Sequence, residues 1–212
     1  MLKPRNIWKA IGGRCARYKA YTRAYSNSPD WPLVLWFRKQ LFRNTAVVSC
    51  RYLAQGRVLD VGTGPGTLPR LLAEIAPNVR VIGIDIERVL LQDARRAVLR
   101  NPARDRISFV LADAHALPFR EGSFEMVASV ASLHLLHDRP KAITELYRVL
   151  KQDGIAFMLV GGRQVYPGKM WLLHFFTSRS ATYLKSIFQT AGFKEIQITN
   201  PQSGLLRVVG RK

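Results

Sequence analysis

The feature that most constrains this chain is an apolar strand followed by glycine at every second position. The segment reads V-L-D-V-G-T-G-P-G over residues 58–66. We expect a β-strand to end near Val61 and the chain to turn through Gly62, Gly64 and Gly66. Glycine tolerates a positive φ and lets a ligand approach the bare backbone. The segment therefore predicts a cradle for a small molecule at the end of a strand.

Two classes of cofactor site place such a loop between a strand and a helix. The dinucleotide fingerprint is G-x-G-x-x-G, with an acid roughly 20 residues later. A motif that begins at Gly62 would need its third glycine at residue 67, which is Thr67. One that begins at Gly64 would need it at residue 69, which is Pro69. The spacing is instead acid-x-G-x-G-x-G, beginning at Asp60.

Apolar strands and helical spacings alternate along the rest of the chain. After the strand ending near Val61, strands are expected over residues 81–85, 107–111, 124–130, 155–160, 194–199 and 205–211. Helices are expected over residues 8–25, 33–53, 67–76 and 180–191, with another closing at residues 145–151 before a turn at Gly154. Gly12 and Gly13 interrupt the first of these helices.

Polar side chains follow the ends of three strands. Asp85 ends the second strand, where a carboxylate can accept hydrogen bonds from both hydroxyls of a ribose. Asp113 follows the third strand, and His134 and His137 follow the fourth. Because ligands of open α/β sheets bind outside the carboxyl ends of the strands, these side chains indicate a single site.

Together, the glycine motif and the acids after the next two strands resemble class I S-adenosylmethionine-dependent methyltransferases. The small group that includes the quinone-biosynthesis C-methyltransferases is the most similar. The resemblance covers roughly residues 57–160 and includes the helix E-L-Y-R-V-L-K at residues 145–151 and the strand that follows it. It implies an α/β fold: a Rossmann-like, mostly parallel seven-stranded sheet with helices on both faces, here with an N-terminal helical extension.

One departure lies just after that helix. The family commonly has Pro-Gly-Gly there, whereas this chain has Gln152, Asp153 and Gly154. Asp-Gly suits a turn that needs a positive φ, so we expect the fold to accommodate the change.

The resemblance also implies the cofactor, S-adenosylmethionine, and the residues around it. The implied cofactor-binding residues are Asp60, Gly62, Thr63, Gly64, Asp85, Ile86, Asp113, Ala114 and Val130. Asp85 would hold the ribose and Asp113 the adenine amino group, although Asp113 could instead cap a helix. His134 is the candidate base ahead of His137, and the alternative is that His134 packs near the cofactor without moving a proton.

Other side-chain chemistry finds less support in the sequence. Cys15 and Cys50 lack metal-ligand spacing, so we expect buried thiols and no metal site. The sequence after the fourth strand lacks the [DN]-P-P-[YFW] motif of base-amino methylases. No apolar run approaches the ~20 residues that span a bilayer, and residues near Met1 lack the apolar core of a signal peptide.

The positive charge of the chain is concentrated outside the predicted core. Of the formal net charge of +19, residues 1–59 and 163–212 carry +18, whereas residues 60–162 have thirteen basic and twelve acidic side chains. Segregation of this kind suggests that the flanks face an anionic partner. We therefore divide the chain into a basic helical extension or lid, residues 1–54, and a cofactor-binding domain, residues 55–212.

Three functions remain open on the sequence. The favoured one is methyl transfer to a small lipophilic or membrane-held acceptor by a cytoplasmic protein whose basic flanks rest on anionic lipid. An aromatic stretch at residues 165–176 either covers the acceptor or packs against the core. The alternatives are an RNA methyltransferase whose cations bind phosphates, and a non-catalytic binding protein on a methyltransferase scaffold. The acceptor and the oligomeric state cannot be derived from the sequence.

Overall fold

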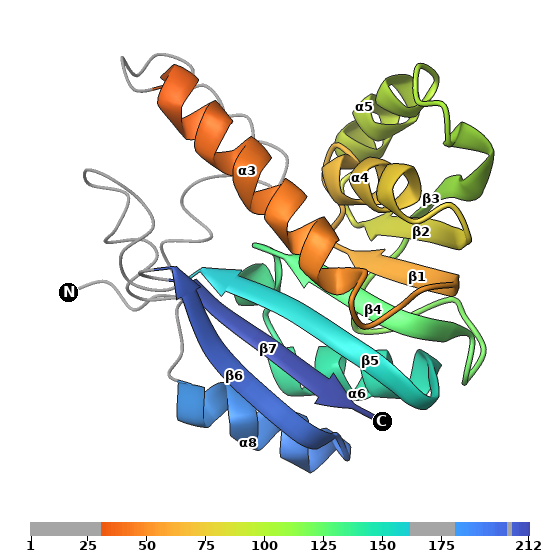
Figure 1. Cartoon of the computed structure of the whole chain (residues 1–212). Helices are drawn as coiled ribbons and strands as arrows, with labels where there is room; N and C mark the ends of the chain where they lie inside the picture. Colours follow the sequence, from red (N-terminus) through yellow and green to blue (C-terminus); the bar gives the residue numbers. More distant parts are fainter. Residues whose placement is uncertain (1–30, 162–180, 203–204) are drawn as a thin grey trace.

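A single twisted sheet of seven strands forms the centre of the protein (Figure 1). The computed structural model describes residues 31–161, 181–202 and 205–212. The strands are β1 (Gly56–Val61), β2 (Val79–Asp85), β3 (Ile107–Leu111), β4 (Phe124–Val130), β5 (Leu150–Gly161), β6 (Lys194–Gln202) and β7 (Leu205–Arg211). Their order is β3-β2-β1-β4-β5-β7-β6, and β7 runs antiparallel to both β5 and β6, whereas the other neighbouring pairs are parallel. The predicted mostly parallel seven-stranded sheet is confirmed.

Helices cover both faces of this sheet. They are α3 (Trp31–Ser49), α4 (Thr67–Ile75), α5 (Arg88–Val98), α6 (Arg139–Val149) and α8 (Ala181–Ala191), with short 3₁₀ turns η1 (Arg104–Arg106) and η2 (Leu133–Leu135). In Figure 1, α3, α4 and α5 lie on one face, and α6 and α8 lie on the other. The N-terminal helical element and the Rossmann-like layering therefore agree with the sequence-based expectation.

Strand β5 shows how the sequence builds two cores from one sheet. Successive side chains of a strand point to opposite faces. Ala156, Met158 and Val160 accordingly join the core beneath α6 and α8. Phe157 and Leu159 join the core beneath α3 and α4. A continuous apolar run is what a strand buried on both faces requires.

Helix α3 ends four residues earlier than predicted. It stops at Ser49 rather than Leu53, because the backbone N–H groups of Arg51 and Tyr52 bond to carbonyls three residues back instead of four. Such bonding within the last turn diverts the backbone from continued α-helix. Leu41 and Val48 pack against the core, and Lys39 and Arg43 are exposed.

The junction between α6 and β5 also differs from the prediction. The helix ends at Val149, and the predicted helical residues Leu150 and Lys151 already belong to β5. Residues between Leu150 and Ile155 bulge out of the pairing with β4. Asp153 takes the positive φ of 61°, while a Cβ on Gly154 would lie 2.8 Å from the Lys151 carbonyl oxygen. The Asp-Gly pair thus provides the turn, with the aspartate in the left-handed conformation.

Some predictions lie outside the described residues. They are the amphipathic helix over residues 8–25, the aromatic stretch at residues 165–176 and the burial of Cys15. Among the described helices, none has both the length and the apolar character needed to cross a membrane.

Candidate functional site

The glycine loop begins where β1 leaves the sheet. The backbone N–H groups of Gly62 and Thr63 both donate to the carbonyl of Ile84 at 2.9 Å, which ties the loop to the end of β2. Gly62, Gly64 and Gly66 all have positive φ, between 55° and 72°. The left-handed conformation at three alternate positions explains why the sequence needs glycine there.

The three glycines differ in what lies around them. A Cβ on Gly62 would lie 1.8 Å from the Ser132 hydroxyl oxygen, and one on Gly66 would lie 2.8 Å from Phe109. A Cβ on Gly64 would meet no atom within 4 Å. Gly62 and Gly66 are therefore required for packing within the protein, whereas Gly64 faces open space that a ligand can occupy.

Asp85 connects the end of β2 to this open position. Its carboxylate accepts hydrogen bonds from the backbone N–H of Gly64 and from that of Glu87, both at 2.9 Å. Burial raises the pKa of Asp85, and the backbone hydrogen bonds oppose that rise. The side chain is partly exposed, and each carboxylate oxygen has a second lone pair. The group can thus still accept hydrogen bonds from a ligand.

Asp60 lies deeper, at the end of β1. It is 2% exposed, and burial raises the pKa of its carboxyl to about 7. The Thr63 hydroxyl lowers this pKa, whereas the negative charge of Asp85 raises it further. Two carboxyl groups with raised pKa values at adjacent strand ends favour a ligand that brings positive charge.

Asp113 lies beyond β3, in a turn that no helix follows. The helix-capping alternative is therefore wrong. Its Oδ1 accepts hydrogen bonds from the backbone N–H of His115 at 3.0 Å and from the Nδ1 of the same residue at 2.5 Å. The Asp113 side chain is 42% exposed and the His115 side chain only 7%, so the carboxylate reaches the surface while its partner is buried.

The end of β4 forms the opposite side of the loop. Ala131 has a φ of 53°, which is unusual for a residue other than glycine, and the next residue is the Ser132 that packs against Gly62. Strained backbone of this kind is concentrated at functional sites. His134 follows in η2, is 4% exposed, and has its carbonyl held by Arg139 at 2.7 Å.

The remaining predicted cofactor-binding residues lie partly at the surface and partly in the core. Ile86 is 43% exposed next to Asp85 and offers an apolar surface to a ligand. The side chains of Ala114 and Val130 are buried in the two cores, so only their backbone could contact a cofactor. Hydrogen bonds from Ala112 to the Asp85 carbonyl and from Ser129 to the Val61 carbonyl hold the four strand ends together.

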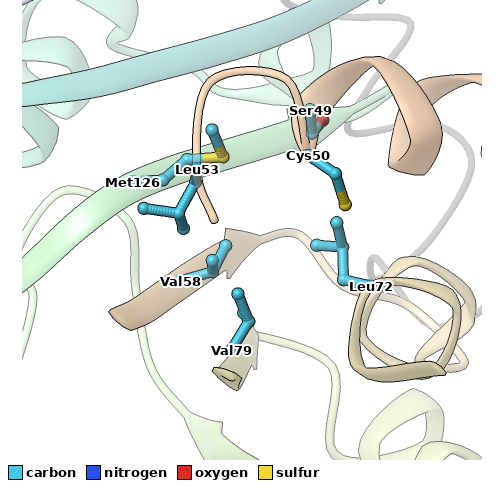
Figure 2. A pocket seen from close by; sticks show the side chains of 7 residues that line it. All are labelled: Ser49, Cys50, Leu53, Val58, Leu72, Val79 and Met126. Atoms are coloured by element: carbon cyan, nitrogen blue, oxygen red, sulfur yellow. The ribbon is translucent and has the colours of Figure 1, made fainter. Parts of the chain in front are cut away.

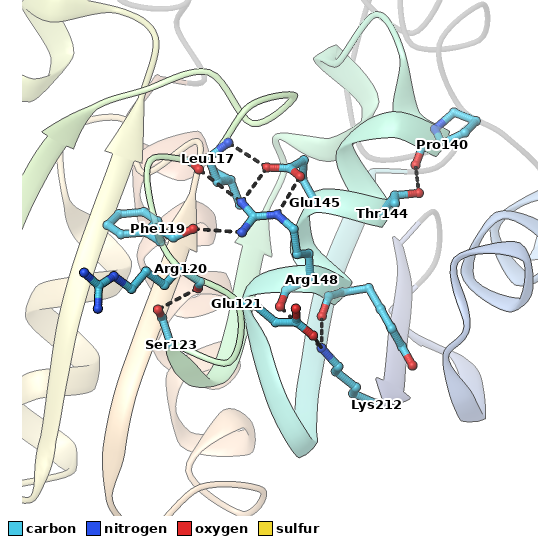
Figure 3. Close-up of polar contacts among 11 residues, drawn as sticks. Leu117, Phe119, Arg120, Glu121, Ser123, Pro140, Thr144, Glu145, Arg148 and Lys212 are labelled. Atoms are coloured by element: carbon cyan, nitrogen blue, oxygen red, sulfur yellow. Dashed lines mark hydrogen bonds and ion pairs between the residues drawn. The ribbon is translucent and has the colours of Figure 1, made fainter.

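An arginine clamp shapes the segment after β3, and the sequence analysis did not predict it. Arg148 donates twice to the Glu145 carboxylate at 2.8 Å and once each to the carbonyls of Phe119 and Leu117 (Figure 3). Glu145 also accepts the backbone N–H of Leu117 at 2.8 Å. The hydrogen bonds from Arg148 are the main reason that the pKa of Glu145 is lowered. The E-L-Y-R motif thus fixes a loop of the site from a distance.

A small apolar hollow lies on the α3 side of the sheet, between α3, α4 and β1. It is lined by Ser49, Cys50, Leu53, Val58, Leu72, Val79 and Met126 (Figure 2). Val79 begins β2, so this hollow lies toward the amino ends of the strands, away from Gly64 and Asp85. Cys50 is only partly buried, rather than fully buried as expected. Its burial raises the pKa of the thiol, which disfavours the nucleophilic thiolate.

Comparison with known proteins agrees with this geometry. Residues 59–158 match the family described as methyltransferase domain. A ubiquinone/menaquinone biosynthesis C-methyltransferase, UbiE, of Citrifermentans bemidjiense is 32% identical over 175 residues, which cover 82% of this chain and 71% of the relative. The chain belongs to the class I S-adenosylmethionine-dependent methyltransferases.

Other members of this methyltransferase family match over shorter stretches. A UbiE of Geotalea uraniireducens is 34% identical over 119 residues, 56% of this chain and 51% of the relative. The chain spans about half the length of several such relatives. The structure of an S-adenosylmethionine-dependent methyltransferase from Aquifex aeolicus matches this chain with a TM-score of 0.70 at 16% identity. The match covers 100% of this chain and 99% of the Aquifex chain. That likeness confirms the fold.

Proposed function

We propose that this protein transfers the methyl group of S-adenosylmethionine to a small lipophilic acceptor. The observation that carries the proposal is the open position at Gly64, directly bonded to the partly exposed carboxylate of Asp85. An open backbone next to a carboxylate suits a ribose with two hydroxyls on one side and a charged amino-acid chain on the other. Family membership supports the same cofactor.

Each part of the cofactor has a candidate partner at this edge of the sheet. Asp85 would hold the ribose hydroxyls, the exposed Ile86 would pack on adenine, and Asp113 would accept the adenine amino group. The backbone of Gly62, Thr63 and Gly64 would lie along the methionine portion. Asp60 sits behind them, where the carboxylate that it forms above about pH 7 would favour a cationic group. Ala114 and Val130 would contribute only backbone.

The cofactor supplies a methyl group that its positive sulfur has already activated. The protein therefore has to align the acceptor atom and exclude water, and such positioning can supply roughly 7–11 kcal/mol. For an acceptor that must lose a proton, His134 is the proposed base, because it follows β4 next to the glycine loop. Arg139 holds the His134 carbonyl and so fixes the backbone that carries this imidazole.

We propose a quinone-type acceptor. The relatives in Citrifermentans and Geotalea are named for ubiquinone and menaquinone biosynthesis. Leu135, which follows β4, is 60% exposed and would offer apolar contact to such an acceptor. The concentration of positive charge in the flanks favours peripheral attachment to an anionic membrane, where a lipophilic acceptor resides.

Transfer of a labelled methyl group tests this activity. The full chain would be incubated with methyl-labelled S-adenosylmethionine and with either membrane lipid extract or structured RNA, with Asp85→Ala as control. The expected result is label in the lipid fraction, lost in the variant. Label in RNA alone would contradict the proposed acceptor, and no label in either fraction together with no cofactor binding would contradict the activity.

Sedimentation with anionic vesicles tests the membrane attachment. One variant replaces Arg14, Arg17 and Arg23 with glutamine, and a matched variant replaces three exposed arginines of the core. The core arginines are Arg96, Arg100 and Arg104. If the flank meets the lipid, the first variant binds vesicles more weakly at physiological salt and the second does not. Equal loss in both variants would mean that only the total charge matters.

A further inference from the structure

His115 is a buried imidazole next to the site, and the chemistry above gives it no role. Its Nδ1 lies 2.5 Å from Oδ1 of Asp113, and its Nε2 lies 3.4 Å from the backbone nitrogen of Asp138. The His137 ring lies against it, with the ring centroids 4.0 Å apart. Asp138 in turn caps α6 by accepting the backbone N–H of Lys141.

These contacts determine where the His115 ring carries its proton. A backbone N–H can only donate, so Nε2 must accept the bond from Asp138 and cannot carry hydrogen. The hydrogen is then on Nδ1, which donates to the Asp113 carboxylate. One neutral imidazole thus connects the turn after β3 to the start of α6, and it fixes which oxygen of Asp113 faces inward.

We propose, given the function proposed above, that His115 is a positioning residue that orients the Asp113 carboxylate toward the 6-amino group of adenine. The backbone N–H of His115 also donates to Asp113 Oδ1, at 3.0 Å. The buried ring adds a further donor to the same oxygen and so restricts rotation of the carboxylate. His115 therefore contributes to the choice of nucleobase without touching the cofactor.

Two nucleosides separate this role from a merely structural one. The full chain would be titrated by calorimetry with S-adenosylhomocysteine and with S-inosylhomocysteine, which has a carbonyl in place of the 6-amino group. The unmodified protein should bind the adenine ligand about tenfold more tightly, because a hydrogen bond to a carboxylate is at stake. The ratio of the two affinities is the readout, since a general loss of structure weakens both ligands equally.

Two substitutions of His115 test which contact of the ring matters. His115→Asn places an amide nitrogen as many bonds from Cα as Nδ1 and keeps the bond to Asp113, whereas His115→Gln reaches only the position of Nε2. We expect the asparagine variant to keep the preference for adenine and the glutamine variant to lose most of it. Thermal unfolding checks that both variants are folded.

The proposal fails if the glutamine variant keeps the preference, or if both substitutions weaken the two ligands by the same factor. It also fails if the unmodified protein does not distinguish the ligands, since Asp113 would then not read the amino group. Failure of the unmodified protein to bind either ligand would instead reject the proposed function itself.

Discussion

The carboxylate of Asp85 and the backbone N–H of Gly64 lie 2.9 Å apart, although 21 residues separate them in the chain. This bond joins the end of β2 to the only glycine of the loop whose missing side chain leaves open space. A ligand placed over Gly64 would therefore meet the Asp85 carboxylate without any rearrangement of the sheet.

Replacement of Asp85 by alanine should abolish most cofactor binding. Two hydrogen bonds to a charged group are each worth about 1.5–3 kcal/mol, so we expect the affinity for S-adenosylhomocysteine to fall by roughly 100- to 10,000-fold. Calorimetry would measure the fall. Asp93→Ala removes an exposed carboxylate of α5 and should leave the affinity unchanged. Equal affinity of both variants would show that the ribose lies elsewhere.

Alanine at Gly62 and at Gly64 should have different effects. Both positions have positive φ, which costs an alanine about 1–2 kcal/mol, but only at Gly62 would the new Cβ overlap Ser132. We therefore expect Gly62→Ala to lower the free energy of unfolding by a further 1–3 kcal/mol or so. Gly64→Ala should remain folded and bind the cofactor weakly. Denaturant unfolding and calorimetry distinguish these outcomes, and the reverse order of stability would refute the packing described for Gly62.

The raised pKa of Asp60 predicts a pH dependence of stability. The folded protein holds this proton up to about pH 7, whereas the unfolded chain releases it near the ordinary value of 3.8. Because the unfolded state then binds fewer protons, stability falls as pH rises through this window, by at most about 4 kcal/mol.

The variant Asp60→Asn should not lose stability in this way as the pH rises, because its side chain does not titrate. Urea unfolding of both proteins at pH 5 and pH 8, without cofactor, would measure it as the difference between the two pH dependences, in which other groups cancel. If the two proteins respond identically to pH, Asp60 is ionised throughout and its burial does not raise its pKa.

Loss of the arginine clamp should destabilise the protein far more than loss of a similar exposed pair. Arg148→Ala removes two hydrogen bonds to Glu145 and those to the Leu117 and Phe119 carbonyls, which should cost about 2–4 kcal/mol. Arg96 pairs with Asp93 at the same i,i+3 spacing but is 78% exposed. Arg96→Ala should cost less than about 0.5 kcal/mol. Denaturant unfolding measures the free energy of unfolding of both variants. Equal losses in Arg148→Ala and Arg96→Ala would show that the arginine clamp does not stabilise the fold.

The sequence predicted the elements whose signals are local. Seven apolar segments became seven strands, and the glycine spacing located the loop at the end of β1. Asp85 could be singled out because an acid directly after a buried strand is unusual. The bounds of α3 and α6 were less well predicted, because backbone hydrogen bonds at single residues, such as that of Arg51 to Val48, decide where a helix ends.

Contacts between distant segments left no such signal. Arg148 reaches carbonyls 29 and 31 residues away, and no periodicity in the sequence indicates those partners. Which glycine faces open space depends on Ser132 and Phe109, which the fold brings to the loop from the segment after β4 and from β3. His115 is different: an imidazole two residues after Asp113 could have been recognised as a partner for the carboxylate from the sequence itself.

The most direct test of the site is a crystal structure of the full chain with S-adenosylhomocysteine. We predict that the nucleoside lies across Gly64 with both ribose hydroxyls bonded to Asp85 and the adenine between Ile86 and Asp113. Density for the ligand at any other place on the protein, with Asp85 still bonded only to backbone, would contradict the account.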